Sequence, residues 1–336
     1  RHAEWKPIPV LDQVTVSGAN NGNFGIFVSP GGALVSDRGG QTSALAWIGP
    51  NGLNTPVSSE LKVYGFPRIS PDGQRVAVTV RDNDRQGISI YDLGTKTFVP
   101  LTNVSVTTAP EWSRDGKSVL YVDIDEKSRT VLYSHPADGG TVARKIADLR
   151  GRSRGLSLAP DQKSVVYVTY IGSQYQLYRL NLDSLGGGKP FLGSSVNSTT
   201  QPQISPDGRW IVVTSDESGA SEVYVRTYPD PTFRVQISSG GGEEGIWSKD
   251  GKTVFYRTGT SEIAARLATS PNLRVVSRDT VIRDMGRVVS GAIFRSTDLG
   301  PDGRFLGLVS NGNDFQLVVV PNWRVEMEQR IAASRH

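Results

Sequence analysis

The side chains through which this chain could do chemistry are few. Of its 336 residues none is cysteine and three are histidine, and two of those, His2 and His336, lie at the termini. These counts exclude thiolate nucleophiles, cysteine-based metal sites and metal centres built from several histidines. Nucleophilic hydrolysis needs a base beside the nucleophile, and a kinase needs its HRD and DFG sequences; neither these nor a GxSxG elbow occurs. We therefore predict no catalytic residues and no enzymatic activity, and we expect His135 in a solvated turn.

Two acidic stretches are the candidates for holding a metal ion. Asp82 and Asp84 stand two residues apart in RDNDRQG, and Asp123 and Asp125 do so in VDIDEKS. Carboxylates at this spacing can offer oxygen ligands to Ca²⁺, although neither stretch matches the full calcium-binding loop. The same composition suits a hairpin turn in water. We predict that the chain needs no cofactor, and we keep a weak Ca²⁺ site as the alternative.

Any such site would be positioned by a repeated element. A tight corner followed by an alternating apolar run recurs along the whole chain. Proline sets φ for the turn, aspartate bonds its own backbone, and glycine takes a positive φ at little cost. Gln162 replaces that glycine in the fourth copy, so we expect a different turn there. The seven copies are SPGGALV (29–35), SPDGQRVAV (70–78), SRDGKSVLYV (113–122), APDQKSVVYV (159–168), SPDGRWIVV (205–213), SKDGKTVFYR (248–257) and GPDGRFLGLV (300–309).

Each unit reads as a four-stranded antiparallel meander. One strand runs into the corner, a second alternates after it, as at Ile211 and Val213, and a third alternates after a polar turn, as at Val223 and Val225. Several short strands in a period of this length are typical of propeller blades. We predict an all-β, seven-bladed β-propeller, with six blades as the alternative if the first or last unit is irregular. The predicted blades are about 24–60, 61–103, 104–149, 150–194, 195–239, 240–284 and 285–321.

Closure of the ring needs a strand from the other end of the chain. The seventh unit supplies three strands, Ile293–Thr297, Phe305–Val309 and Phe315–Val320, and then the pattern stops. We expect the missing outer strand from residues 7–16, which would remove the free sheet edges. Residues 1–336 would then form a single propeller domain.

The two ends of the chain leave the repeat pattern. In the tail, residues 322–336, Trp323, Met327 and Ile331 recur every fourth residue and predict one apolar stripe on a short helix. The chain begins at Arg1 without a methionine or a signal-peptide core, so we expect an excised piece of a longer protein or a mature form. It contains no apolar run long enough to span a bilayer, and we predict no membrane contact by this segment.

The central channel is where we expect a binding site. The innermost strands of a propeller line its channel, and their entry loops ring one mouth. A mixed ring of arginine and glutamate there would suit a small polar or anionic ligand or a protein, and it would equally satisfy the strand ends of a water-filled channel. The candidate ligand-binding residues are Arg68, Glu111, Arg154, Gln203, Glu244 and Arg295.

The repeated SPDG corner with its alternating strand resembles the WD40-like (PD40) repeat of TolB-like propellers. PQISPDGRWIVVTSDESGASEVYVRTYPDP, followed by GGGEEGIWSKDGKTVFYR, is similar to the C-terminal propellers of bacterial serine/threonine protein kinases. The resemblance extends over the chain from about residue 8. It implies an extracytoplasmic (periplasmic) domain of a membrane-anchored parent, and it designates no functional residue. The sequence departs from the resemblance in one respect: TolB itself looks like a six-bladed propeller, whereas seven units are counted in this chain.

Three classes of function remain open from the sequence. A sensory or protein-interaction propeller predicts rigid blades and no catalytic triad, which is what the sequence shows. A propeller enzyme of the lyase or lactonase type would need clustered histidines or carboxylates at the strand-entry face. A structural assembly module would show an extensive exposed apolar patch. With a formal charge of +4 and no basic run, we predict no nucleic-acid partner, and we expect an unidentified protein or small molecule.

Overall fold

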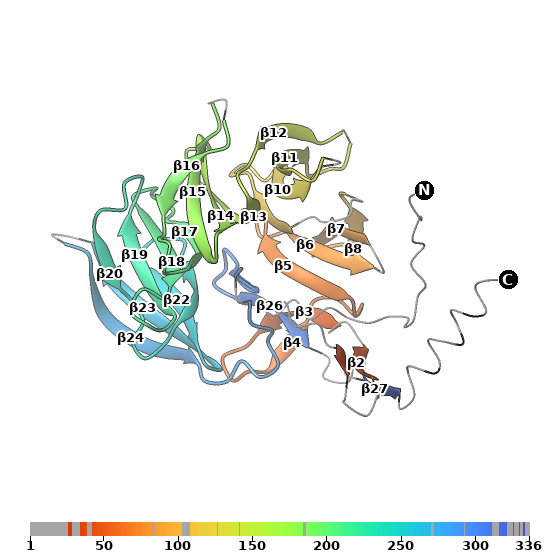
Figure 1. The fold of residues 1–336 in the computed structure, drawn as a ribbon. Coiled ribbons are helices and arrows are strands. Elements are labelled where there is room, and N and C mark those ends of the chain that lie inside the picture. The colour runs from red at the N-terminus through yellow and green to blue at the C-terminus, as the bar shows by residue number, and fades with distance from the viewer. Residues whose placement is uncertain are drawn as a thin grey trace. The chain divides into compact units, whose positions relative to one another are not determined.

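The computed structural model is all-β and consists of two compact units, Ser43–Ser310 and the two ends of the chain, Arg1–Thr42 with Asn311–His336. The larger unit is a β-propeller (Figure 1). The residues that the structure describes are 26–28, 34–38, 42–82, 85–102, 108–125, 127–140, 142–183, 186–269, 272–291, 293–310 and 316–320, with Val325, Gln329 and Ala332.

The propeller has six blades, each a four-stranded antiparallel sheet. The prediction of seven was wrong, and the stated alternative of six is confirmed. Blade 1 is β5 (Val63–Ile69), β6 (Arg75–Asp82), β7 (Arg85–Asp92) and β8 (Thr97–Pro100); blade 2 is β9 (Thr108–Trp112), β10 (Ser118–Ile124), β11 (Thr130–Pro136) and β12 (Arg144–Asp148); blade 3 is β13 (Arg152–Leu158), β14 (Ser164–Ile171), β15 (Gln174–Asn181) and β16 (Lys189–Leu192); blade 4 is β17 (Thr199–Ile204), β18 (Trp210–Ser215), β19 (Glu222–Thr227) and β20 (Arg234–Gln236); blade 5 is β21 (Glu243–Trp247), β22 (Thr253–Thr258), β23 (Ser261–Ala268) and β24 (Arg274–Ile282); blade 6 is β25 (Thr297–Leu299), β26 (Phe305–Ser310), β3 (Ser43–Ile48) and β4 (Asn54–Pro56).

Blade 6 closes the ring with two strands from each end of the propeller. β26 pairs antiparallel with β3, so that Leu306 lies opposite Trp47, and β4 follows on the outside. This corrects the predicted closure by one N-terminal strand, which was placed at residues 7–16, outside the described part of the chain. The strand predicted at 315–320 exists as β27 (Gln316–Val320), but it pairs with β2 (Leu34–Arg38), and β2 pairs with β1 (Ile26–Val28).

The six corners that precede the second strand of each blade have the same conformation. Each closes with a hydrogen bond from the N–H of its fourth residue to the carbonyl of its first, 2.8–2.9 Å long. The fourth residue has a positive φ in every case, including Gln162 at 59°, so the expectation of a different turn in that copy was wrong. The corner aspartate accepts the N–H two residues ahead, 3.0 Å from Asp161 to Lys163, and this bond holds the turn without glycine.

Apolar side chains of neighbouring blades form the core. Val212 and Val223 of blade 4, for example, pack with Trp247 and Tyr256 of blade 5, and the other clusters join neighbouring blades in the same way. His135 lies in β11 and is buried, with its Nδ1 2.8 Å from the carbonyl of Pro136, so the expected solvated turn was wrong. These layers between blades hold the innermost strands β5, β9, β13, β17, β21 and β25 next to one another around the axis.

The C-terminal tail is described at three positions, Val325, Gln329 and Ala332, which are exposed and have helical backbone. The predicted apolar stripe of Trp323, Met327 and Ile331 lies outside the described residues. In the part of the chain that the structure describes, no helix is long and apolar enough to cross a membrane.

Candidate functional site

Four of the innermost strands contain a β-bulge before the corner. The pairing with the second strand shifts register between Gly65 and Arg68 in β5, and equivalent shifts occur in β13, β17 and β21. The residue four positions before the corner has a positive φ in these four strands: 53° at Phe66, 54° at Gly155, 52° at Gln201 and 57° at Glu244. Because a bulge re-aims the neighbouring side chains, it decides which residues face the axis.

In four of the six blades, the side chain two positions before the corner is hydrogen-bonded to the following blade. Gln203 Oε1 accepts the N–H of Trp247 at 2.7 Å, Ser157 Oγ that of Ile204 at 3.0 Å, and Asp298 Oδ2 that of Ile69 at 2.8 Å. Glu111 accepts the N–H of Leu158 in the same way. In all four cases the donor lies one residue before the corner of the following blade. Gln203 and Glu111, both predicted as ligand-binding residues, thus accept hydrogen bonds from the following blade.

Three of the predicted residues come together beside the axis. Arg68 Nη1 donates to the carbonyl of Arg295 at 3.2 Å, and Arg68 Nε lies 3.9 Å from Glu111 Oε2. Arg295 Nη1 lies 3.7 Å from Asp298 Oδ1. Burial, reinforced by the charge of Arg295, lowers the pKa of Arg68 to about 10, while burial raises the pKa of Glu111. Two cations face two carboxylates here, so the cluster compensates its own charge.

Glu244 holds the segment of residues 288–296, which we call the channel segment, against the innermost strands. Its carboxylate accepts the N–H of Gly291 at 2.7 Å and the N–H and hydroxyl of Ser296 at 2.9 Å. Gln201 Nε2 also donates to the carbonyl of Gly291. Burial raises the pKa of Glu244, and these hydrogen bonds oppose the shift. Glu244 therefore acts as an anchor for the backbone.

The channel segment contacts four blades besides its own, including blade 4 through Gln201. Phe294 packs edge-on against Phe66 of blade 1, with ring centroids 4.5 Å apart, and a Cβ added at Gly155 of blade 3 would lie 2.9 Å from its ring. Arg257 of blade 5 donates to the carbonyl of Val288 at 3.0 Å. This segment precedes β25, so it lies at the end of the channel where the innermost strands begin, opposite the corners. It occupies that end.

Arg154 is the predicted residue that the structure leaves apart. It lies five positions before its corner and is exposed. Arg295 occupies the same position relative to its own corner but is buried. The two residues thus occupy the same position in the repeat, but one is exposed and the other is buried.

The two acidic stretches behave as turns where they are described. Asp125 accepts the N–H groups of Lys127 and Arg129 and pairs with the Arg129 guanidinium at 2.6 Å. Asp123 is buried, and burial raises its pKa. The side chain of Asp82 and all of Asp84 lie outside the described residues. No group of three or more metal-ligating side chains converges within the described part of the chain. The Ca²⁺ alternative stays untested.

The corner end of the channel carries a pocket of about 350 Å³ that the sequence did not predict. Its rim comes from the second residue of all six corners: Pro71, Arg114, Pro160, Pro206, Lys249 and Pro301. Ile69, Trp247 and Leu299, each the last residue before its corner, lie below them. Arg114 and Lys249 belong to blades 2 and 5, three blades apart in a ring of six, so they stand opposite each other. We call this pocket the axial mouth.

A comparison of the second corner residue across the six repeats could have indicated the axial mouth. The second corner position is proline in four blades and a cation in two, whereas the third is aspartate in all six. The aspartates bond their own turns, as Asp250 does with Ser248 Oγ at 2.6 Å and with the N–H of Lys252 at 3.0 Å. The variable second position therefore carries the difference between blades, and Arg114 and Lys249 are exposed.

Comparisons with known proteins agree with this geometry. The Tol-Pal system protein TolB of Bordetella pertussis is 27% identical over 154 residues, which are 45% of this chain and 34% of that protein. A TolB candidate of Agrobacterium tumefaciens superposes with a TM-score of 0.56 at 18% identity, over 80% of this chain and 98% of that one. The fold is a TolB-like β-propeller. No protein-family model matches the chain.

The TolB-like fold also has enzymatic neighbours. An oligogalacturonate lyase in complex with manganese superposes with a TM-score of 0.52 at 14% identity, over 90% of this chain and 81% of that one. At this identity the likeness shows the fold alone. The match to the curated TolB spans about a third of that protein's length, so its activities and partners do not pass to this chain directly.

Proposed function

We propose that this chain is a non-catalytic protein-interaction propeller whose axial mouth binds an acidic side chain of a partner together with its apolar neighbours. The observation that carries the proposal is the opposition of Arg114 and Lys249 across a pocket otherwise lined by prolines and Trp247. A carboxylate placed between the two cations is attracted from both sides, and the proline rings offer rigid apolar surface at no cost in side-chain entropy.

The two ends of the channel support this choice of site. The channel segment occupies the end where the innermost strands begin, through Phe294 and the Glu244 hydrogen bonds. The corner end is hollow, and its cations are free to act. Arg114 makes one hydrogen bond, at 3.2 Å to the carbonyl of Pro160, and no ion pair is recorded for Lys249 among the described residues. A partner would therefore approach from the corner side.

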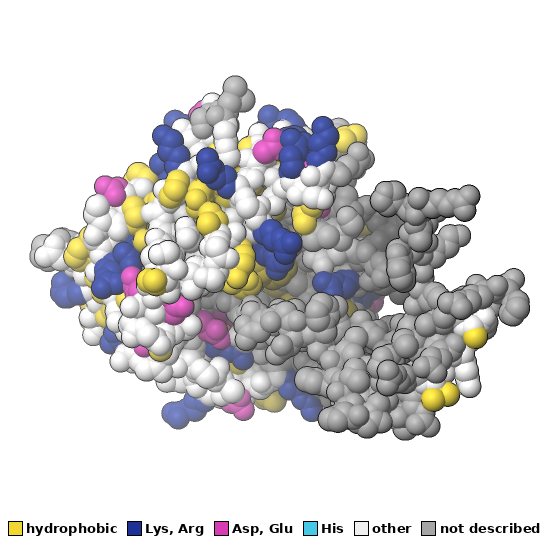
Figure 2. Space-filling view, in the orientation of Figure 1, with side chains coloured by type: hydrophobic (Ala, Val, Ile, Leu, Met, Phe, Trp, Pro, Cys, Tyr) yellow, Lys and Arg dark blue, Asp and Glu magenta, His cyan; other side chains and the backbone are white. Residues whose placement is uncertain are grey.

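The surface in view favours a local contact over a broad electrostatic one. In Figure 2 the Lys and Arg side chains stand apart and are interspersed with Asp and Glu, and they form no continuous basic stripe. Phosphate backbones are bound by clustered cations, and the face in view shows no such cluster. The proposal thus depends on two specific cations.

Selection from a library of random linear peptides tests the proposal. Peptides that bind the propeller should be enriched in Asp or Glu next to proline-compatible apolar residues, and they should compete with one another for a single site. Peptides without an acidic residue, or peptides that bind with unchanged affinity after Arg114 and Lys249 are both reversed to Glu, would contradict it.

A finer assignment follows from the sequence resemblance to kinase-linked propellers. We propose that the chain is the extracytoplasmic sensor domain of a bacterial transmembrane serine/threonine protein kinase, with the axial mouth as its sensing site. The coding sequence upstream of Arg1 tests this step independently. A kinase domain followed by an apolar stretch long enough to cross a membrane supports it, and a different upstream domain overturns it while leaving the axial mouth untouched.

A further inference from the structure

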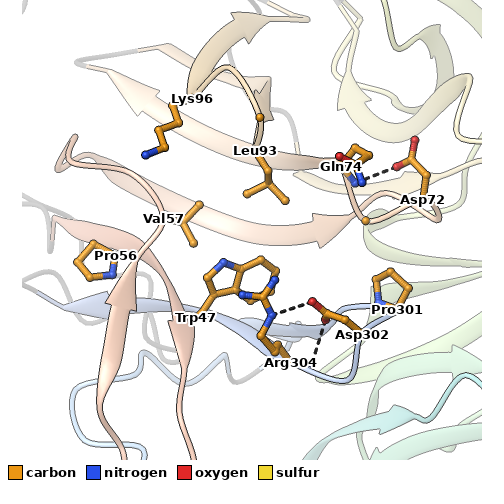
Figure 3. A pocket seen from close by; sticks show the side chains of 12 residues that line it. Trp47, Pro56, Val57, Asp72, Gln74, Leu93, Lys96, Pro301, Asp302 and Arg304 are labelled. Carbon is orange, nitrogen blue, oxygen red and sulfur yellow. Dashed lines mark hydrogen bonds and ion pairs between the residues drawn. The ribbon is translucent and has the colours of Figure 1, made fainter.

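A second pocket lies where the ring closes, between blade 6 and blade 1 (Figure 3). Its volume is about 480 Å³, and its residues come from the corners of both blades, from β3, from the end of β4 and from the turn between β7 and β8. Val57, Pro56 and Leu93 give it an apolar wall. It shares Pro301 with the axial mouth, whereas its Trp47, Val57, Asp72, Leu93, Lys96 and Arg304 do not line the axial mouth. We call it the closure pocket.

The floor of the closure pocket is rigid and uncharged overall. The Arg304 guanidinium lies 4.1 Å from the centre of the Trp47 ring, and its Nε donates to Asp302 at 2.7 Å. The corner of blade 6 fixes Asp302, which also accepts the N–H of Arg304. The charge of Arg304 is thus satisfied within the floor, and a ligand meets an aromatic surface.

Asp72 stands at one end of the pocket without a cation of its own. In five blades the residue two positions after the corner aspartate is Lys or Arg, but in blade 1 it is Gln74. Arg75, the next residue, donates to the carbonyl of Gly116 at 2.8 Å and lies over the Trp112 ring. Within the described residues Asp72 forms no salt bridge, although it accepts the N–H of Gln74 at 3.0 Å and the more distant charge of Arg75 contributes to lowering its pKa. The Ser70 hydroxyl lowers the pKa of Asp72, so this carboxyl is ionised at neutral pH.

Lys96 stands at the opposite end, with Leu93 and Val57 between it and Asp72 (Figure 3). Its φ is 60°, an unusual value for lysine, and its N–H donates to the carbonyl of Asp92 at 2.9 Å. Asp92 Oδ1 accepts two further N–H groups of the same turn, which fixes its shape. No hydrogen bond or ion pair of the Lys96 ammonium is recorded in the described part of the chain. The turn is therefore fixed by hydrogen bonds, and it carries the Lys96 ammonium without a partner among the described residues.

We propose that the closure pocket binds a short peptide with free ends, its amino group at Asp72, its carboxylate at Lys96 and its side chains against Val57, Leu93 and the Trp47–Arg304 floor. One negative and one positive group at opposite ends of an apolar wall match a zwitterion, and neither group forms a salt bridge within the described residues. A volume of this size suits a ligand of about two or three residues. This site and its free-peptide ligand are distinct from the partner contact at the axial mouth.

Calorimetric or NMR titration with alanyl-leucyl-alanine tests the proposal on the whole chain. The free tripeptide should bind saturably, and its N-acetylated and C-amidated forms should each bind about three- to fivefold more weakly, as expected for one partly exposed ion pair. Asp72→Asn and Lys96→Asn should each weaken the free peptide by a similar factor. Asparagine keeps the acceptor that the Ser70 turn needs and tolerates the positive φ of residue 96.

The blocked peptides make the assignment of each end specific. The acetylated form should bind the wild type and Asp72→Asn equally, and the amidated form should bind the wild type and Lys96→Asn equally. Asp250→Asn, the same change in the corner of blade 5, is the matched control and should leave all affinities unchanged. Equal binding of free and blocked peptides, or no binding by a wild-type protein whose thermal unfolding is normal, overturns the proposal. Neither result bears on the axial mouth.

Discussion

Gln203 and Trp247 lie in consecutive blades and are joined by two hydrogen bonds. Gln203 Oε1 accepts the N–H of Trp247 at 2.7 Å, and Gln203 O accepts the indole N–H at 3.2 Å. The side-chain bond recurs with Ser157, Glu111 and Asp298 at other junctions. Arg68 and Ile246 occupy the position in the remaining two blades, and neither side chain can accept a hydrogen bond.

We predict that Gln203→Ala destabilises the propeller by about 1–3 kcal/mol, because it leaves the N–H of Trp247 buried without a partner. Urea unfolding followed by tryptophan fluorescence measures the change. Gln236→Ala in the exposed outer strand β20 is the control and should stay within about 0.5 kcal/mol of the wild type. Peptides bound at the axial mouth should keep their affinity for Gln203→Ala. A stable Gln203→Ala variant that loses such peptides would show that this residue binds ligand after all.

We predict that Glu244→Ala lowers the free energy of unfolding more than Gln203→Ala does, by about 3 kcal/mol or above. The reason is that one buried carboxylate satisfies donors from Gly291 and Ser296. Glu244→Gln should lose less, because it retains one acceptor oxygen. In Glu244→Ala, amide hydrogen exchange should accelerate relative to the wild type in residues 288–296 more than in the outer strands of blade 3. Uniform acceleration over all blades would contradict a local anchor.

Glu262 gives the chain a pH-dependent stability. It is fully buried, one of its oxygens has no hydrogen-bond partner in the described part of the chain, and burial together with the charge of Glu244 raises its pKa well above the ordinary value. A raised pKa means that the folded state holds a proton that the unfolded state has already lost above about pH 4.3, so stability falls as the pH rises from there.

We therefore predict that Glu262→Gln equals the wild type near pH 4 and exceeds it by about 1–3 kcal/mol at pH 8, which is the cost of desolvating the group. Chemical unfolding at a series of pH values checks this. Below about pH 4 both proteins should weaken, because serine hydroxyls lower the pKa values of Asp72, Asp115 and Asp250 and their stabilisation is lost on protonation. Parallel curves for the two proteins across pH 4–8 would refute the role of Glu262.

Ring closure predicts the outcome of truncation. A chain of residues 43–310 contains every strand of the six blades and should unfold in one cooperative transition. A chain of residues 62–310 lacks β3 and β4, leaves β26 as an exposed edge and should lose cooperative unfolding or aggregate. Size-exclusion chromatography and thermal unfolding compare the two. Equal stability of both chains would mean that β3 and β4 do not close the ring.

The sequence predicted the blades well and their closure poorly, for physical reasons. Turn chemistry and alternation are local, so the strands around the corners from Ser70 to Gly303 could be read directly. Which strands pair across the two ends of the chain is not local, and the corner at 29–35 leads to β2, which pairs outside the propeller. The long interval between Gly251 and Gly303 reflects the channel segment, which is held by tertiary contacts with Glu244, Arg257 and Phe66.

The candidate site was likewise predictable only in its local features. Arg68, Glu111 and Arg295 were predicted near the axis and do meet there. Their role could not be predicted, since the positive φ at Phe66 and Glu244 sets which neighbouring side chains turn inward, and no residue preference reveals it. Arg114 and Lys249 were overlooked, because a corner residue looks like part of a turn until the ring places its six copies together.

The axial mouth is tested most directly by reversing its two cations. The affinity of selected acidic peptides should fall at least tenfold, about 1.4 kcal/mol, for the double variant Arg114→Glu, Lys249→Glu. The matched control, Lys117→Glu with Lys252→Glu, changes the net charge equally and uses exposed cations of the same two corners that lie outside the pocket. We predict that the control retains binding within about threefold. Equal losses in both double variants would show that net charge alone attracts the peptides, and unchanged binding in the first would place their site elsewhere.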